Sequence, residues 1–173
     1  MNDPRNQPQY QVRFGFGRQR ALELSPGADV VVWVDALADG VTPVPELPGP
    51  FSILAAGTGA ATTVADWVLA QQTAKGDRFT VAVIAAGDPH GGFTVDDLLA
   101  AGAIIDALAD AGIDYISPEA ASAVAAFTGL KSAHDHLLSA SVAGQQHISD
   151  VGRDLLHAAI VSNAAASFEI VRE

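Results

Sequence analysis

Short apolar runs alternate along this chain with longer stretches of helical periodicity. Four segments of five or six residues predict strands: 11–16, where apolar and polar residues alternate as in a half-buried strand, and the apolar runs 30–34, 51–56 and 81–86. The second and fourth segments are apolar throughout, which is typical of strands buried on both faces of a parallel sheet. Weaker runs predict two more strands, at 112–116 and 168–171.

Helical spacing of apolar residues fills the intervals between these runs. It predicts helices at 18–24, from about 63 to 75, and at 95–111, 118–127, 131–138 and 148–161. Thr94 stands at the N-cap position of the third helix, so we expect a capping box. In it the Thr94 hydroxyl accepts from the Asp97 N–H, and the carboxylate accepts from the Thr94 N–H. The alternation predicts a three-layer α/β fold, with a mixed or mostly parallel sheet and helices on both faces.

Length and composition fit one domain over residues 1–173. Residues 1–9 are polar and contain proline, so we expect them to be disordered. Residues 41–50 hold four prolines, which predicts a rigid loop instead of a helix. No apolar run approaches the roughly 20 residues that span a bilayer, and the chain has no cysteine. These features indicate a cytoplasmic protein without disulfides or thiolate chemistry.

The formal net charge of −11 argues against a nucleic-acid or an anionic membrane partner, because both need a basic face. A small anionic ligand is compatible with this charge only where local cations outweigh the global field. Only nine Lys and Arg residues are available for that purpose.

Acidic residues follow two of the buried strands. Asp35 comes directly after the second strand, while Asp88, His90, Asp96 and Asp97 follow the fourth. Carboxylates at the carboxyl ends of parallel strands are common catalytic groups and Mg²⁺ ligands. Four of these residues also have a structural alternative: Asp35 capping a turn, Asp96 facing the helix dipole, Asp97 in the capping box and His90 exposed to solvent.

A glycine-rich turn, Gly57-Thr58-Gly59, lies between the third strand and the next helix. Free N–H groups at such a turn can bind phosphate, although a plain turn and helix cap explains the same residues. His134 and His136 are two residues apart on an expected helix and therefore cannot share a metal ion. Arg153 could bind an anion, but we expect an ion pair with Asp150 or Asp154 instead.

The central stretch carries a family resemblance. The letters A-V-I-A-A-G, followed by G-x-F-T-x-D-D-L-L-x-A-G-A-I-I from Gly91 to Ile105, resemble the 2-phosphosulfolactate phosphatase family. Weaker similarity extends over 12–14, 30–37 and 117–120. The resemblance implies Mg²⁺-dependent hydrolysis of a small phosphorylated acid. It also implies site residues: Asp35 and Asp97 as catalytic groups, and Asp35, Asp96 and Asp97 as Mg²⁺ ligands. The turn Gly57, Thr58 and Gly59 lies outside the matched residues; under this hypothesis its backbone N–H groups would bind the phosphate.

The chain departs from that family pattern in two places. The segment after Leu37 is much shorter than in family members, and Gln145 stands where they carry an arginine in a loop. The alternative is therefore a catalytically inactive homologue that keeps the scaffold as a ligand-binding protein or as a homo-oligomeric interaction protein. A third interpretation is a nucleotide-binding module that uses the Gly57 turn.

Overall fold

A five-stranded sheet forms the centre of the computed structural model, which describes residues 3–37, 43–164 and 168–173. Its strands are β1 (Val12–Phe16), β2 (Val30–Val34), β3 (Ser52–Ala56), β4 (Val81–Ala85) and β5 (Glu169–Arg172). The order across the sheet is β1-β4-β2-β3-β5; the first four strands are parallel and β5 is antiparallel to β3. The prediction of a mixed, mostly parallel sheet is confirmed.

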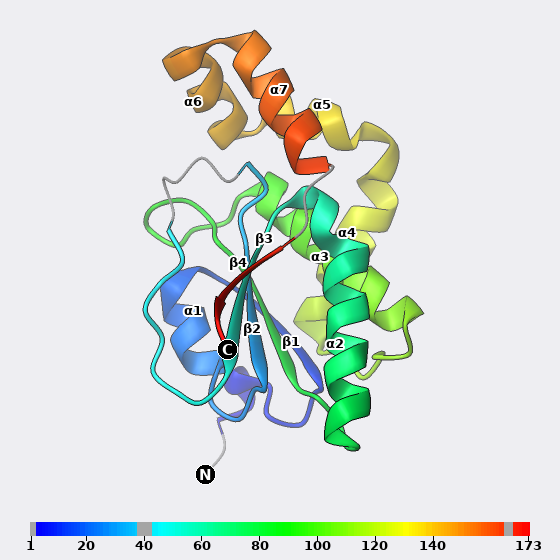
Figure 1. The fold of residues 1–173 in the computed structure, drawn as a ribbon. Coiled ribbons are helices and arrows are strands. Elements are labelled where there is room, and N and C mark those ends of the chain that lie inside the picture. Colours follow the sequence, from blue (N-terminus) through cyan, green and yellow to red (C-terminus); the bar gives the residue numbers. More distant parts are fainter. Residues whose placement is uncertain (1–2, 38–42, 165–167) are drawn as a thin grey trace.

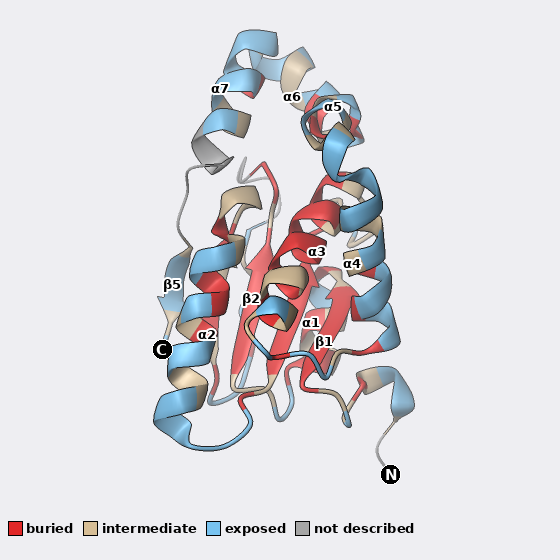
Figure 2. Ribbon diagram, turned by 90° about the vertical axis from the view of Figure 1, so that its right-hand side faces the viewer, coloured by how far each residue is buried: buried red, intermediate tan, exposed pale blue. Residues whose placement is uncertain are grey.

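Helices cover both faces of this sheet, as the sequence predicted (Figure 1). Helix α1 (Gly17–Leu24) lies on one face together with the segment that leads into β3. The opposite face is covered by three helices, α2 (Ala61–Lys75), α3 (Val95–Asp110) and α4 (Pro118–Leu130). Because both faces of β2 and β4 are covered, every residue of these two strands is buried (Figure 2).

The remaining helices lie above the carboxyl ends of the parallel strands (Figure 1). They are α5 (His134–Ala140), α6 (Val142–Val151) and α7 (Arg153–Ala164), and three short 3-10 helices occur elsewhere: η1 (Pro4–Asn6), η2 (Thr58–Ala60) and η3 (Lys131–Ala133). Within the described residues, no helix combines the length and the apolar character needed to cross a membrane.

Two predicted elements in the second half of the chain are wrong. The segment 112–116 is not a strand, and it contributes one isolated bridge between Ile116 and Val12. The single helix expected at 148–161 is two helices, because Gly152, with φ of 97°, ends α6 and lets α7 start in a new direction. Ser141 begins α6 as its N-cap, accepting from the Gly144 N–H at 2.9 Å.

The N-terminal segment also differs from the expectation of disorder. Residues 1–2 lie outside the described residues, but Asp3 caps η1 and the Gln7 side chain is buried against β1. Its amide donates to the Phe14 carbonyl and accepts from the Phe14 N–H, both at 2.9 Å. A side-chain amide here replaces a neighbouring strand, which hydrophobic periodicity does not reveal.

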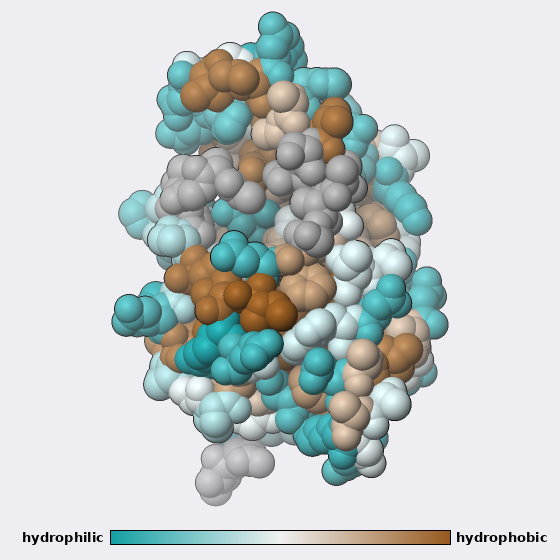
Figure 3. Space-filling view, viewed as in Figure 1, coloured by the Kyte–Doolittle hydropathy of each residue, from teal (hydrophilic) through white to brown (hydrophobic). Residues whose placement is uncertain are grey.

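Among the described residues, exposed apolar side chains gather at two places, and single ones such as Phe93 occur elsewhere. Ile170 and Val171 lie on β5 at the edge of the sheet, and brown side chains gather where β5 crosses the front of the molecule in Figure 3. Others lie on α6 and α7, including Val142, Val151 and Leu155. An assembly of several copies stays a prediction.

Candidate functional site

The carboxyl ends of β1, β2 and β4 lie side by side, and their connections leave in opposite directions. The chain passes from β1 into α1 on one face of the sheet, and from β4 through residues 86–94 into α3 on the other face. Ligands of open α/β sheets bind where such connections diverge. We call the two halves of this edge the α1 side and the α3 side.

On the α3 side, the carboxylate of Asp97 occupies the space at the strand ends. Its side chain is only 4% exposed, and its Oδ1 accepts from the Ala36 N–H at 2.8 Å. Its Oδ2 accepts from the Gly87 N–H and from the Thr94 hydroxyl, each at 2.8 Å. Ala36 and Gly87 follow β2 and β4, so one carboxyl group joins the ends of two neighbouring strands.

The capping box expected at the start of α3 is wrong. Thr94 is the N-cap residue, but its side chain makes no cap hydrogen bond to the helix backbone. Its hydroxyl donates to the Asp97 carboxylate instead. The carboxylate has turned away from the helix terminus because two backbone N–H groups at the strand ends are better partners for a buried acceptor.

Burial raises the pKa of Asp97 to about 7. The Ala36 N–H opposes this shift by stabilising the charged form, whereas the negative charges of Asp96 and Asp35 add to it; the Thr94 hydroxyl again lowers the pKa. The structure therefore does bring Asp35, Asp96 and Asp97 close enough to interact. It also gives Asp97 a carboxyl group that changes charge near neutral pH.

These three acids do not form an evident metal centre. Both Asp97 oxygens are engaged by the protein, and Asp35 is half-buried with its Oδ1 3.2 Å from the Leu37 N–H. Within 3–37, 43–164 and 168–173, no three or more His, Asp or Glu side chains are grouped so that they could hold a metal ion. Magnesium bound by Asp35, Asp96 and Asp97 stays a prediction.

The Gly57–Gly59 turn lies beside the same strand end. The Thr58 hydroxyl donates to the Ala36 carbonyl at 3.0 Å, and the turn continues directly as η2. The backbone N–H of Ala60 is used within the turn, at 3.3 Å from the Gly57 carbonyl oxygen. These bonds explain the turn structurally, and a phosphate contact by Gly57, Thr58 and Gly59 stays a prediction.

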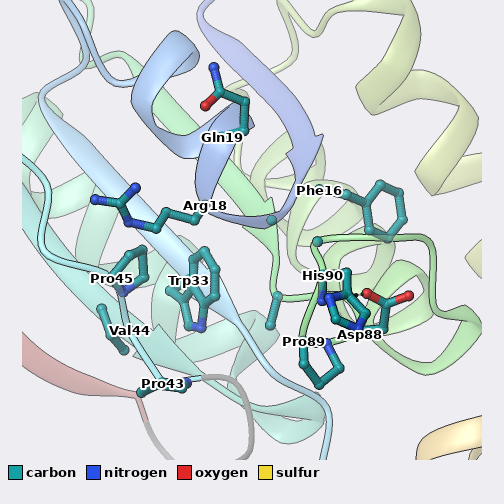
Figure 4. Close-up of a pocket in the computed structure, with 13 residues that line it drawn as sticks. Phe16, Arg18, Gln19, Trp33, Pro43, Val44, Pro45, Asp88, Pro89 and His90 are labelled. Atoms are coloured by element: carbon teal, nitrogen blue, oxygen red, sulfur yellow. Dashed lines mark hydrogen bonds between the residues drawn. The ribbon is translucent and has the colours of Figure 1, made fainter.

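A hollow of about 570 Å³ opens on the α1 side. Its wall is built from the start of α1, the end of β2, the segment 43–45 and the loop after β4 (Figure 4). The lining residues are Phe16, Gly17, Arg18, Gln19, Trp33, Pro43, Val44, Pro45, Ala86, Asp88, Pro89, His90 and Gly91. Of these, only Asp88 and His90 were candidates from the sequence.

Arg18 is the cation of this hollow. Seven of the nine Lys and Arg residues contact a carboxylate, a carbonyl or an aromatic ring. Among the residues that the structure describes, Arg18 and Arg153 have no such partner, and the ion pair expected for Arg153 is absent. Arg18 also lies in the first turn of α1, where the N-cap residue Phe16 offers no side-chain acceptor to the N–H groups.

The loop after β4 supplies the other charged groups of the hollow. The Asp88 Oδ1 accepts from the His90 N–H at 2.7 Å and from the Gly92 N–H at 3.0 Å. The Gly92 and His90 N–H groups lower the pKa of Asp88 in that order, so its carboxylate stays charged at neutral pH. His90 is exposed at the rim of the hollow.

Gln145 does not contribute to either side of this edge through its side chain. It lies on α6 instead of in a loop, and its amide donates to the Ser139 carbonyl at 2.7 Å. This contact joins α6 to the last turn of α5.

A signal in the sequence could have identified the hollow. Arg18 follows the strand residue Phe16 by only two positions, so an arginine had to lie where a strand passes directly into a helix.

A comparison of this chain with models of known protein families finds no match, and a search of curated proteins finds none either. The phosphosulfolactate phosphatase resemblance accordingly rests on the quoted residues alone.

Proposed function

We propose that this chain binds a small anionic molecule, with phosphorylated acids as the leading class, in the hollow on the α1 side. The observation that carries the proposal is the unpaired guanidinium of Arg18 over a hollow at the carboxyl ends of three parallel strands. A phosphorylated acid is the class that the family resemblance implies. The cysteine-free composition supports a cytoplasmic setting for this function.

Local electrostatics favour an anion here despite the net charge of −11. Unit charges about 4 Å apart interact by roughly 1–4 kcal/mol, depending on the local dielectric, whereas charges beyond about 8–10 Å are screened by physiological salt. Arg18 can also bind a phosphate or carboxylate through two parallel hydrogen bonds. The uncapped first turn of α1 adds N–H groups and a favourable helix dipole on the same side.

Titration calorimetry with inorganic phosphate and with phosphoglycolate tests this proposal. We expect Arg18→Gln to weaken binding about tenfold or more, because a hydrogen bond to a charged group contributes about 1.5–3 kcal/mol. Arg153→Gln is the matched control, since Arg153 is also exposed and without a partner among the described residues but lies on α7. Equal losses in both variants, or no binding by the unaltered chain, would contradict the proposal.

A Mg²⁺-dependent phosphatase is the second candidate. The specific observation in its favour is the raised pKa of Asp97 beside Asp35, because a carboxyl group that titrates near 7 is suited to proton transfer. Bound Mg²⁺ would supply charge stabilisation at the phosphate oxygens. The engagement of both Asp97 oxygens by the protein weighs against this candidate.

Phosphate release from small phosphate esters, with and without added Mg²⁺, separates the two candidates. A phosphatase requires turnover that is lost in Asp35→Asn and kept in Asp110→Asn, a control at the exposed end of α3. Tight anion binding without turnover leaves the first proposal as the function.

A further inference from the structure

We infer that the ligand of the hollow on the α1 side is an organic anion of low charge with a flat apolar body, such as an aryl phosphate or phosphonate, instead of a compact multiply charged acid. This inference rests on the proposed binding function and specifies its ligand. It follows from three properties of the hollow: its size, the distribution of its apolar residues and its charge.

The hollow is larger than the charged group of any simple anion. Its volume of about 570 Å³ falls within the range of about 300–1,000 Å³ that is usual for sites of small organic molecules. One phosphoryl group held by Arg18 leaves most of that space unfilled. The rest of the ligand must therefore fill the space with further atoms, or the site keeps water there.

Apolar groups line part of the hollow, and the polar side chains of Asp88 and His90 lie on the side away from Arg18 (Figure 4). Trp33, from β2, lies at the centre of the site (Figure 4). Arg18 extends toward Pro45 on one side of Trp33, and Pro89 lies with His90 on the other side. Val44 and Pro45 are half-buried, so contact with an apolar group would remove apolar surface from water.

Flat rings suit such a wall. The proline rings of the lining present rigid apolar faces, whereas Trp33 is only 2% exposed and therefore forms the floor of the hollow. A ring also loses little conformational freedom on binding. A branched polyol or dicarboxylic acid would place polar groups against these faces without hydrogen-bond partners, which is unfavourable.

The charged groups of the hollow match a low ligand charge. Arg18 is the only Lys or Arg in the lining, and the Asp88 carboxylate lies on the same loop as His90. The Asp88 carboxylate repels further negative charge, so a second or third acidic group of the ligand would have no cation of its own among the described lining residues. A sulfonated and carboxylated phosphate would leave charges uncompensated there.

Three phosphonates with the same head group test the inference by titration calorimetry. We expect phenylphosphonate to bind about tenfold or more tightly than methylphosphonate, because the ring buries additional apolar area. Phosphonoacetate, which adds a carboxylate, should bind no more tightly than methylphosphonate. If methylphosphonate binds but phenylphosphonate is no tighter, the inference fails and the proposed function stands; if none of the three binds, both fail.

Two variants locate the ring. Val44→Ser should weaken phenylphosphonate about threefold and leave methylphosphonate unchanged, and Val142→Ser, at an exposed valine of α6, is its control. In Trp67→Phe, Trp33 is the remaining tryptophan of the two in the chain, so phenylphosphonate should change its emission. Tight binding that leaves both the Val44→Ser affinity and the Trp33 emission unchanged would place the ring elsewhere and overturn the inference.

Discussion

The two sides of one sheet edge treat negative charge in opposite ways. On the α3 side, backbone N–H groups after β2 and β4 are available to an anion, and the chain supplies that anion itself as Asp97. On the α1 side, Arg18 and the first turn of α1 are available, and no carboxylate of the described residues takes that place. The same divergence of connections thus produces an internal hydrogen-bond site on one side and an open hollow on the other.

Because of this difference, we expect the α3 side to contribute mainly to stability and the α1 side mainly to ligand binding. Three hydrogen bonds to a buried carboxyl group make the α3 side part of the folded core, so changes there should appear as a loss of stability. The residues of the α1 side are mostly exposed or half-buried and lie on loop and helix-start positions. Changes of its exposed side chains without partners, such as Arg18, should alter ligand affinity and leave the free energy of unfolding nearly unchanged.

The largest expected effect comes from Asp97→Ala. It leaves the N–H groups of Ala36 and Gly87 without their acceptor inside the protein, and each such loss costs about 1–3 kcal/mol. We expect the free energy of unfolding at pH 7 to fall by about 3–5 kcal/mol, measured by urea denaturation. Asp110→Ala, at the exposed end of the same helix, should leave stability unchanged or slightly raised. A loss below about 1 kcal/mol in Asp97→Ala would show that Asp97 does not hold the two strand ends together.

The second effect is on the pH dependence of stability. The pKa of Asp97 is raised from 3.8 to about 7 in the folded chain, so the folded state binds a proton more tightly than the unfolded state does. This contribution is complete below about pH 4 and is lost as the pH rises through 7. Relative to Asp97→Asn, which cannot titrate, the unaltered chain should lose about 2–4 kcal/mol between pH 4 and pH 8. If the difference in unfolding free energy between the two proteins does not change with pH, the pKa of Asp97 in the folded chain has its ordinary value.

Asp88 provides the opposite control from the α1 side. Its pKa is lowered by the N–H groups of Gly92 and His90, so its contribution is present above the unfolded pKa and is lost as the pH falls. The stability difference between the unaltered chain and Asp88→Asn should therefore change with pH in the opposite direction. If the stability differences for Asp97→Asn and Asp88→Asn change with pH in the same direction, the α1 side and the α3 side do not differ in how they hold a carboxylate.

Much of this fold can be read from the sequence because its strands are buried on both faces. The runs at β2 and β4 are apolar without interruption, and their bounds agree with the structure to within one residue. The Ser117-Pro118 start of α4 is equally local, since the Ser117 hydroxyl accepts from the Ala120 N–H. Where a short stretch contains its own reason for folding, the prediction is confirmed.

The site was less predictable because its bonds join residues far apart in the chain. The Asp97 carboxylate reaches Ala36, 61 residues away, and local spacing instead suggested a bond within its own helix turn. The hollow likewise depends on Trp33, Val44 and Arg18 meeting at one edge. A sequence pattern indicates which residues are acidic or apolar. It does not indicate which acidic residues, such as Asp97, bind the backbone of the same chain and are therefore not available to a ligand.

A third effect concerns the backbone beside Asp97. Gly87 has a φ of 72°, and a Cβ at this position would lie 2.3 Å from the Gly92 carbonyl oxygen. Gly87→Ala should therefore lower the free energy of unfolding by about 2–3 kcal/mol, by positive-φ strain and a backbone clash together. Gly27→Ala is the matched control, because Gly27 has a φ of 74° and nothing within 4 Å of the added carbon. A control loss as large as that of Gly87→Ala would assign the whole effect to backbone conformation and none to the close packing of the loop.

The smallest effect, at Thr94, tests the charge of Asp97 directly. Thr94→Val removes the hydroxyl that donates to the Asp97 carboxylate and keeps the shape of the side chain. A hydrogen bond to a charged acceptor is stronger than one to a neutral acceptor. The loss of stability should therefore be about 1–2 kcal/mol at pH 8, where Asp97 is charged, and smaller at pH 5, where it is protonated. Because the hydroxyl lowers the pKa of Asp97, the same variant should also move the pH midpoint upward, and Thr94→Ser should restore both. Equal losses at the two pH values would mean that the carboxyl group closing the α3 side does not change its charge in this range.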